Sequence, residues 1–324
     1  MYLAARLAPA GQVSMDFGSC LQGVAVPASH GAAHAAISVV VVTYESAADI
    51  AVCLDSLRAA AGRHQLEIVV VDNASRDASA EIARGVGVKV VENPTNLGLS
   101  RAIDVGADAT GAPWLLLVNP DTRLAAGSLA RLLATASADP SIGCVGPHLR
   151  NSDGSPYPTG RRFPSILVGA VHAALGTLWP ANPATRHYHL TGLDRSGPVG
   201  VDWVSGACML LRRQAYEAAG RFDAGYFMYF EEMDFCLRLA RAGWRVVYDP
   251  LAEVTHMIGG STRSAPYRKV LNHHRSALRF YRRRYARDPR IVLLPLSAAL
   301  LAARGLVSLA RTAVAQARSR RNGG

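Results

Sequence analysis

The sequence predicts an α/β fold with an open, mostly parallel sheet and helices on both faces. Runs of β-branched and apolar residues at 37–42, 67–71, 88–91 and 114–118 alternate with helical stretches over roughly 110 residues. Such runs are typical of parallel strands that are buried on both faces. Of the 324 residues, 50% are hydrophobic and 18% are charged, which fits a globular chain and excludes a disordered or fibrous one.

Polar residues follow three of the predicted strands. Thr43-Tyr-Glu-Ser follows the first, Asp72 ends the second, and Asn119-Pro-Asp121 follows the fourth. Open α/β sheets bind ligands at the carboxyl ends of their strands, although Asp and Asn are also ordinary turn residues there. The first turn has no glycine, so this Rossmann-type sheet lacks a dinucleotide-binding motif, and the sequence has no P-loop. A bound diphosphate would therefore need arginines or a divalent cation, and Asp is a hard ligand suited to Mg²⁺ or Mn²⁺.

The middle of the chain is predicted to contain a long connection between strands. A strand is expected at 142–146, and residues 147–199 are rich in Pro, Gly and Arg. They are expected to form a surface connection with one short helix at 167–175, and connections of this length are usually functional or disordered. The chain is expected to return to strand over 201–211.

Three acids, Glu231, Glu232 and Asp234, stand at the start of a predicted helix within residues 226–239. The helix dipole and the unpaired backbone N–H groups of a first turn favour ionised carboxylates. A base placed there is expected to be unprotonated near neutral pH and ready to accept a proton. The alternative is ordinary helix capping, with Asp234 and Arg238 forming an i,i+4 surface pair.

The net charge of +11 is concentrated near the carboxyl end of the chain. Between Arg268 and Arg321 the sequence has 14 Lys or Arg residues and a single acid, Asp288. An apolar run at 291–303 interrupts these charges, and at thirteen residues it is shorter than the roughly 20 needed to span a bilayer. A basic amphipathic helix lying at the cytoplasmic membrane surface is one interpretation, and a helix packed on the body of the protein is the other. Nucleic acid is not an expected partner, because no reader motif is present.

The five cysteines are odd in number and scattered, without a Cys-x-x-Cys pair. This pattern argues against a disulfide framework and against a thiolate zinc site, so a reducing cytosol is the expected compartment. Residues 1–36, which are rich in Ala, Gly and Ser, are expected to be a flexible amino-terminal segment.

The sequence resembles the family 2 glycosyltransferases, which are inverting enzymes of GT-A fold, over residues 37–262. The resemblance rests on six motifs: Val39-Val-Val-Val-Thr-Tyr44, Val70-Val-Asp-Asn73, Asn96-Leu-Gly98, Asn119-Pro-Asp121, Trp203-Val-Ser-Gly206 and Phe227-Met-Tyr-Phe-Glu-Glu-Met-Asp234. Within this family it looks most like the actinobacterial rhamnosyltransferases that transfer L-rhamnose from dTDP-rhamnose to decaprenyl-diphosphate-linked GlcNAc. That closer match rests on Leu178-Trp-Pro-Ala-Asn-Pro183 and Phe227-Met-Tyr229.

The resemblance implies a glycosyltransferase domain at 37–265, with a nucleotide-sugar half at 37–148 and an acceptor half at 149–265. The charge pattern predicts that a basic, membrane-associating tail follows at 266–324. The nucleotide-sugar ligands implied by the resemblance are Thr43, Glu45, Asp72, Arg101 and Asn119, and the implied acceptor ligands are Trp203, Ser205, Gly206 and Arg238.

The resemblance also implies that Asp121 and His256 ligate Mg²⁺ or Mn²⁺, and that Glu232 is the catalytic base, oriented by Glu231 and Asp234. The sequence departs from the family at Glu232, where relatives have Asp, and at Asp104, where they often have Asn. The implied reaction is sugar transfer to a lipid-linked saccharide at the inner face of the cell membrane. A different donor, such as UDP-hexose or a galactofuranose donor, and a non-catalytic sugar-nucleotide-binding protein are the alternatives.

Overall fold

In a computed structural model of the chain, the described residues are 36–176, 179–192, 194–257 and 266–322. The predicted segment 1–36 and the motif residue Leu178 lie almost entirely outside this set. The strands are β1 (Ala36–Thr43), β2 (Gln65–Asp72), β3 (Lys89–Glu92), β4 (Trp114–Val118), β5 (Thr122–Leu124), β6 (Ile142–Asn151), β7 (Pro156–Tyr157), β8 (Val199–Val201), β9 (Cys208–Arg212) and β10 (Arg245–His256). The helices are α1 (Ile50–Ala60), α2 (Ser79–Gly85), α3 (Leu99–Asp108), α4 (Ser128–Ala138), α5 (Ile166–Leu175), α6 (Pro183–Tyr188), α7 (Arg213–Ala218), α8 (Glu231–Arg241), α9 (Pro266–Arg284) and α10 (Leu294–Asn322), with a 3₁₀ turn at Pro289–Leu293.

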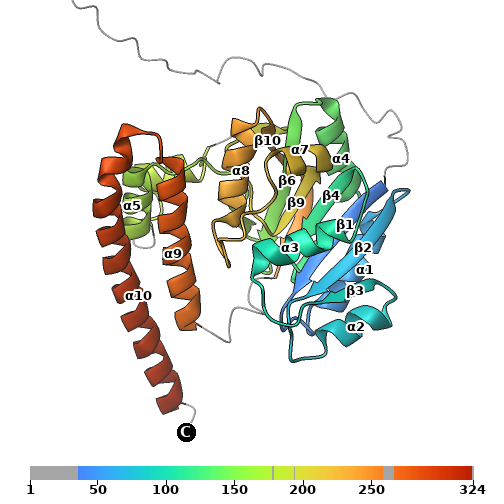
Figure 1. Ribbon diagram of the computed structural model, residues 1–324, viewed down its shortest axis with the longest axis horizontal. Coiled ribbons are helices and arrows are strands. Elements are labelled where there is room, and N and C mark those ends of the chain that lie inside the picture. Colours follow the sequence, from blue (N-terminus) through green and yellow to red (C-terminus); the bar gives the residue numbers. More distant parts are fainter. Residues whose placement is uncertain (1–35, 177–178, 193, 258–265, 323–324) are drawn as a thin grey trace, which may run out of the picture. The chain divides into compact units, whose positions relative to one another are not determined.

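One sheet runs through the molecule in the order β3-β2-β1-β4-β9-β6-β10-β5 (Figure 1). The four strands that come first in the chain are parallel, as the apolar runs predict. The antiparallel strand β9 then joins β4 to β6, and β10 lies parallel to β6. The boundary drawn at residue 148 falls inside β6, so both predicted halves share one sheet, and the proposed division into domains stays a prediction.

Two apolar cores cover the two faces of the sheet because neighbouring strand residues point in opposite directions. Val40 of β1 packs with residues of α3, α7, α8 and α9 on one face. Val39 and Val41 pack with residues of α1, α2 and α4 on the other. The doubly covered sheet explains why these strands are continuous apolar runs.

The connection between β6 and β9 is more ordered than predicted. The helix expected at 167–175 is α5, but α6 and the short strands β7 and β8 were not predicted. The single strand expected over 201–211 is wrong, because a turn at 202–207 separates β8 from β9. That turn carries Trp203, Ser205 and Gly206, so its irregular backbone belongs to the candidate site described below.

The basic tail forms two helices, α9 and α10, that lie side by side and contact α5 (Figure 1). Helix α9 packs on the body through Phe280 and Tyr281, and Tyr285 directly after the helix is buried as well. The prediction that the apolar segment is too short to span a bilayer is wrong, because the helix does not end at residue 303. Helix α10 continues through Arg304. By length and composition alone, the 21-residue stretch Pro289–Leu309 is long and apolar enough to cross a membrane. Only 6% of its most apolar part is buried inside the protein.

Candidate active site

Thr43 and Asp72 are neighbours at the carboxyl ends of β1 and β2. The two residues pair in the parallel register, and both are buried. One Asp72 carboxylate oxygen accepts a hydrogen bond from the Ser75 N–H at 2.9 Å. The other Asp72 oxygen and the Thr43 hydroxyl have no hydrogen-bond partner in the described part of the chain. Buried polar atoms are rarely left unpaired, so these two are candidates to contact a ligand.

The loops after β1 and β2 hold each other in unusual backbone conformations. Glu45 and Ala74 have φ values of 51° and 63°, in the left-handed region that side chains other than glycine seldom adopt. The Glu45 N–H donates to the Ser75 hydroxyl at 3.0 Å, and the Ser46 N–H donates to the Ser79 hydroxyl at 2.8 Å. Strained conformations of this kind persist where the surrounding contacts determine them, and they cluster at functional sites.

Asn73 fixes the conformation of the neighbouring loop through its side-chain hydrogen bonds. This role was not predicted from the sequence, although Asn73 is the last residue of the Val70-Val-Asp-Asn73 motif. Its amide donates to Asn96 Oδ1 at 3.0 Å and its carbonyl accepts from the Leu97 N–H at 2.9 Å. These bonds place the start of α3, where Arg101 is exposed and has no ion pair among the described residues. Arg101 is therefore available to a bound anion next to the ends of β1 and β2.

Asp121 and His256 meet where β5 and β10 pair, as the resemblance implies. His256 lies opposite Thr122 in the antiparallel ladder, and its Nε2 is 3.2 Å from Asp121 Oδ1. Two adjacent ligands of one octahedral cation, each bound at about 2.1 Å, are about 3 Å apart, so the pair fits a divalent metal. The described residues contain no group of three metal-ligating side chains, so further ligands would come from the substrate or water.

Asp49 stands near this pair and was not singled out from the sequence. Burial raises its pKa, and the charge of Asp121 raises it further. A cation between the two carboxylates would remove that repulsion, so the negative charge of Asp49 would favour a cation bound at Asp121.

The acids of α8 follow two strained residues. Tyr229 and Phe230 have φ values of 69° and 66°, and α8 begins directly after them at Glu231. The Glu231 carboxyl is 5% exposed, and one oxygen of Glu231 and one of Glu232 lack a hydrogen-bond partner in the described chain. The strained turn therefore directs two carboxylates into the protein instead of into solvent.

The prediction that the helix amino terminus keeps these acids ionised is wrong, because burial has the larger effect on their pKa values. Burial raises the pKa of Glu231 well above the usual range, with the Glu232 charge adding to the effect. Burial also raises the pKa of Glu232, while backbone N–H groups and Arg161 lower it by a smaller amount. Loss of hydration therefore outweighs the helix terminus, and Glu232 is a stronger proton acceptor than an exposed glutamate.

The turn before β9 lies against the Glu232 side chain. A Cβ atom at Gly206 would stand 3.5 Å from Glu232 Cβ and 3.9 Å from its carboxyl carbon. The Gly206 N–H is among the groups that lower the pKa of Glu232. Ser205 is buried in the same turn and Trp203 is buried at its start, which brings three of the expected acceptor residues near Glu232.

Arg161 is a partly buried cation that was not predicted from the sequence to be a site residue. Its guanidinium carbon lies 4.7 Å from the ring centre of Trp203, 5.5 Å from that of Tyr157 and 5.8 Å from that of Tyr188. Its Nε donates to the Pro158 carbonyl at 2.8 Å. This aromatic cage holds a positive charge that acts on Glu232. The only sequence signal was an Arg-Arg pair in a long connection.

Asp234 and Arg238 make structural contacts, and the structure does not place them with Glu232. The Asp234 carboxylate is 1% exposed and accepts from Arg238 Nε at 2.8 Å. Arg238 also donates to the carbonyls of Ala219 and Arg221, which ties α8 to the preceding loop. The i,i+4 pair is thus present but buried, not a surface pair, and the expected roles in orienting the base and binding acceptor gain no support here.

Asp104 also makes a structural contact, with Tyr216 of α7. Its carboxylate accepts a hydrogen bond from the Tyr216 hydroxyl of α7, and burial raises its pKa. The aspartate at this position therefore joins α3 to α7 through Tyr216.

Two series of contacts connect the Asp121 and His256 pair to Glu232. In the first, the Asn119 N–H donates to the Ala207 carbonyl at 2.9 Å, and the adjoining Gly206 contacts Glu232. In the second, the rings of His256 and Tyr157 are 5.8 Å apart edge to face, and Tyr157 belongs to the Arg161 cage. Residues far apart in the sequence thus converge on the region around β4, β9 and the start of α8.

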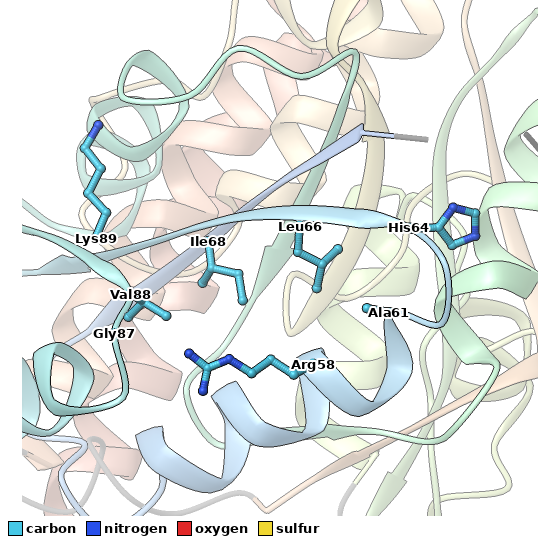
Figure 2. Close-up of a pocket in the computed structure, with 8 residues that line it drawn as sticks. All are labelled: Arg58, Ala61, His64, Leu66, Ile68, Gly87, Val88 and Lys89. Atoms are coloured by element: carbon cyan, nitrogen blue, oxygen red, sulfur yellow. The ribbon is translucent and has the colours of Figure 1, made fainter. Parts of the chain in front are cut away.

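A separate pocket of about 290 Å³ lies beside the amino ends of β2 and β3 (Figure 2). Side chains from the end of α1 and the amino ends of β2 and β3 line it, among them Arg58, Ile68 and Lys89. Its lining contains no carboxylate, and Asp72 lies at the other end of β2. This pocket is therefore not part of the candidate active site.

The family model for Glycosyl transferase family 2 matches residues 38–220 of the chain. The family model for Glycosyl transferase family group 2 matches residues 184–317. The chain belongs to glycosyl transferase family 2 and is a glycosyltransferase, which confirms the family resemblance.

Curated relatives share much of its length. The N-acetylglucosaminyl-diphospho-decaprenol L-rhamnosyltransferase of Mycobacterium tuberculosis is 38% identical over 265 residues, covering 77% of this chain and 85% of that protein. The low-salt glycan biosynthesis hexosyltransferase Agl10 of Haloferax volcanii is 25% identical over 229 residues, covering 68% and 66%.

Solved structures share the fold. The mannosyltransferase PcManGT of Pyrobaculum calidifontis, solved with GDP-Man and Mn²⁺, has a TM-score of 0.53 at 17% identity, covering 87% of this chain and 76% of that one. GalNAc-T7, solved with UDP, GalNAc and Mn²⁺, has a TM-score of 0.54 at 18% identity, covering 77% and 48%. At these identities the likeness shows the fold alone, and it confirms the expected GT-A-like sheet.

Proposed function

We propose that the protein transfers L-rhamnose from dTDP-L-rhamnose to GlcNAc carried on a polyprenyl diphosphate, as a step in cell-wall or polysaccharide assembly. The observation that carries this proposal is the 38% identity to the mycobacterial rhamnosyltransferase over 77% of the chain. The arrangement of side chains around β1, β2, β5 and α8 suits such a reaction, because it offers ligands for a nucleotide, a cation and an acceptor hydroxyl.

The donor side uses residues at strand ends. Thr43 and Asp72 offer unpaired buried oxygens to the nucleoside, and Arg101 offers a guanidinium to the diphosphate. Asp121 and His256 would hold Mg²⁺ or Mn²⁺, which supplies charge neutralisation for the departing nucleoside diphosphate. Glu45 and Asn119 stand in the loops that border these groups.

The acceptor side uses Glu232 as the base in a single displacement. The acceptor oxygen forms a bond to the anomeric carbon on the face opposite the leaving group, the bond to the diphosphate oxygen breaks, and Glu232 accepts the hydroxyl proton. The configuration at the anomeric carbon is therefore inverted. Arg161 keeps a share of Glu232 ionised, and Trp203, Ser205 and Gly206 form the neighbouring surface for the acceptor.

The C-terminal helices would hold the enzyme at the inner face of the membrane. Val292, Leu296 and Leu306 are 77%, 58% and 70% exposed, and arginines flank this apolar stretch. Removing residues after 290 is expected to release the protein from the membrane fraction of lysed cells. Unchanged membrane association would remove this part of the proposal.

The proposed reaction is tested with purified protein, Mn²⁺ or Mg²⁺, and GlcNAc-diphospho-decaprenol as acceptor. Among dTDP-L-rhamnose, UDP-glucose, UDP-galactose and UDP-galactofuranose, only dTDP-L-rhamnose is expected to yield a disaccharide lipid by mass spectrometry. Transfer from a UDP sugar and not from dTDP-L-rhamnose would show that the donor is a UDP sugar. Binding of a sugar nucleotide without transfer or hydrolysis would favour the non-catalytic alternative.

A further inference from the structure

A groove of about 640 Å³ runs between α9, the start of α10 and the loop before α8. The loop contributes Gly225 and Phe227, and α10 contributes Leu294, Pro295 and Ala298. The remaining wall comes from α9. The groove is larger than the pocket at the amino ends of β2 and β3, and it borders a loop that leads directly into the acids of α8.

The α9 wall is a single helix face. Arg275, Leu278, Arg279 and Arg282 follow one another at i, i+3, i+4 and i+7, a spacing that places side chains above each other on one side of a helix. Phe280, on the other side, is fully buried against the body of the protein. Burial of that apolar side therefore fixes which residues α9 presents to the groove.

The groove carries unpaired positive charge. Its lining includes three arginines and no acid. Arg279 is paired with Asp223 at 2.8 Å. Arg275 and Arg282 are exposed and make no ion pair within the described residues. Two guanidinium groups about two helical turns apart offer paired N–H donors to a phosphate or diphosphate.

Apolar side chains lie beside these arginines. Phe227 is 39% exposed and Leu278 is 36% exposed, both large apolar side chains of the groove. The apolar surface continues onto Leu293 and Leu296, which are 42% and 58% exposed. A ligand with a diphosphate joined to a hydrocarbon chain would satisfy both kinds of surface at once.

The groove is joined to both sides of the candidate active site. The Ser276 hydroxyl of α9 donates to the Met228 carbonyl at 2.9 Å, three residues before Glu231. The Leu99 N–H at the start of α3 donates to the Phe227 carbonyl at 2.8 Å. The same loop therefore forms a wall of the groove, contacts the donor-side helix and leads to the base.

We propose that this groove binds the prenyl diphosphate part of the lipid-linked acceptor, which rests on the proposed function in taking the acceptor to be a polyprenyl diphosphate saccharide. Arg275 and Arg282 bind the diphosphate, and Phe227, Leu278 and the start of α10 contact the first isoprene units. The saccharide end then extends along the 225–230 loop towards Glu232. The hydrocarbon chain leaves the groove over the exposed apolar surface of α10.

The test measures binding of farnesyl diphosphate to the full-length protein in detergent, by calorimetry and in the absence of any sugar donor. Farnesyl diphosphate is expected to bind more tightly than either farnesol or inorganic diphosphate. The double variant Arg275→Gln/Arg282→Gln is expected to weaken its binding by about 100-fold, because each hydrogen bond to a charged group accounts for about tenfold. Arg268→Gln, an exposed arginine of α9 outside the groove, is the matched control and is expected to bind as the unaltered protein does.

A second variant tests the apolar wall without changing charge. Ala298→Trp places a large ring in the groove and is expected to weaken farnesyl diphosphate binding while leaving the melting temperature unchanged. If both variants bind farnesyl diphosphate as tightly as the unaltered protein, the groove is not the prenyl site.

Failure of the groove and failure of the proposed reaction give different results. Loss of farnesyl diphosphate binding in the arginine variant, with no rhamnosyl transfer by the unaltered protein, supports the groove and overturns the donor. Normal rhamnosyl transfer to the decaprenyl acceptor by the arginine variant, at an unchanged KM for that acceptor, overturns the groove and leaves the reaction standing.

Discussion

The two halves of the sheet place functional residues in different ways. On the donor side, β3, β2, β1 and β4 are parallel, and Thr43, Asp72 and Asp121 lie at or just after strand ends. On the acceptor side, the antiparallel strand β9 joins the sheet, and the proposed base Glu232 lies after a strained turn and near the partly buried Arg161. On the proposed function, strand ends place the groups that would hold a nucleotide and a cation, whereas contacts between separate loops place Glu232.

The largest effect is expected on the donor side, from removing the metal ligand. Asp121→Asn keeps the shape of the side chain but removes the charge that would hold the cation. Transfer is expected to fall on the order of 10²- to 10³-fold, because a bound cation supplies several kcal/mol of charge stabilisation. Titration with Mn²⁺ in the presence of dTDP is expected to show weakened metal affinity. Asp55→Asn, an exposed acid of α1, is the control, and equal Mn²⁺ affinity in both variants would exclude Asp121 as a ligand.

A smaller effect is expected on the acceptor side, from removing the caged cation. Because the Arg161 charge lowers the pKa of Glu232, Arg161→Met is expected to raise that pKa and leave less ionised base at neutral pH. The rate at pH 7 is expected to fall about tenfold, with the acid limb of the pH profile displaced to higher pH and activity recovering there.

Arg161→Lys, which keeps the charge, is expected to restore part of the profile, and Arg186→Met, an exposed arginine of α6, is expected to leave it unchanged. A uniform loss of rate at all pH values would instead indicate that Arg161 only supports the local fold.

The buried acids also predict a change in stability. Burial raises the pKa of Glu231, so the folded protein binds a proton that the unfolded chain releases, and stability falls as pH rises above the ordinary glutamate pKa. Glu231→Gln is expected to raise the melting temperature at pH 8 by about 2–4 °C for each kcal/mol relieved, and to change it little at pH 4.5. Differential scanning calorimetry at both pH values measures this, with Glu81→Gln on the exposed face of α2 as control. A lower melting temperature at pH 8 would contradict it.

The smallest effect concerns two partly buried histidines of the acceptor side, His189 and His273. Burial lowers the pKa of His189 and of His273 to about 4, from an ordinary value of 6.5. Between pH 6.5 and about 4 the unfolded chain binds protons that the folded protein does not, so stability is expected to decline as pH falls through this window. His273 packs against Tyr229 and Phe230, so His273→Gln is expected to reduce the slope. An unchanged slope in that variant would remove His273 as a source of the decline.

The sequence predicted the donor side better than the acceptor side, for a physical reason. Thr43, Asp72 and Asp121 follow apolar runs whose parallel pairing brings strand ends to one edge. Arg161 lies in a long connection, and its position depends on the nearby ring of Tyr157 and on the rings of Tyr188 and Trp203, which come much later in the chain. No local pattern encodes such a cage, so neither Arg161 nor its relation to Glu232 could be predicted.

Local patterns also misled where burial decided the outcome. The first turn of α8 suggested ionised acids, but loss of hydration dominates at Glu231 and Glu232. The Asp234 and Arg238 pair was predicted by its spacing, but its burial among backbone carbonyls was not. Arg304 suggested the end of an apolar segment, although α10 continues past it because one long side chain does not interrupt a helix.

The most direct test of the assignment of Glu232 as the base compares Glu232→Gln with Glu232→Asp in single-turnover rhamnosyl transfer, together with calorimetric binding of dTDP-L-rhamnose and Mn²⁺. Glu232→Gln is expected to slow transfer by about 10³-fold, with donor and metal affinity unchanged, because only the proton acceptor is lost. Glu232→Asp keeps a carboxylate displaced by about 1 Å and is expected to retain more activity than the glutamine variant. Full transfer by Glu232→Gln, or equal loss of transfer and of donor affinity, would contradict the assignment of Glu232 as the base.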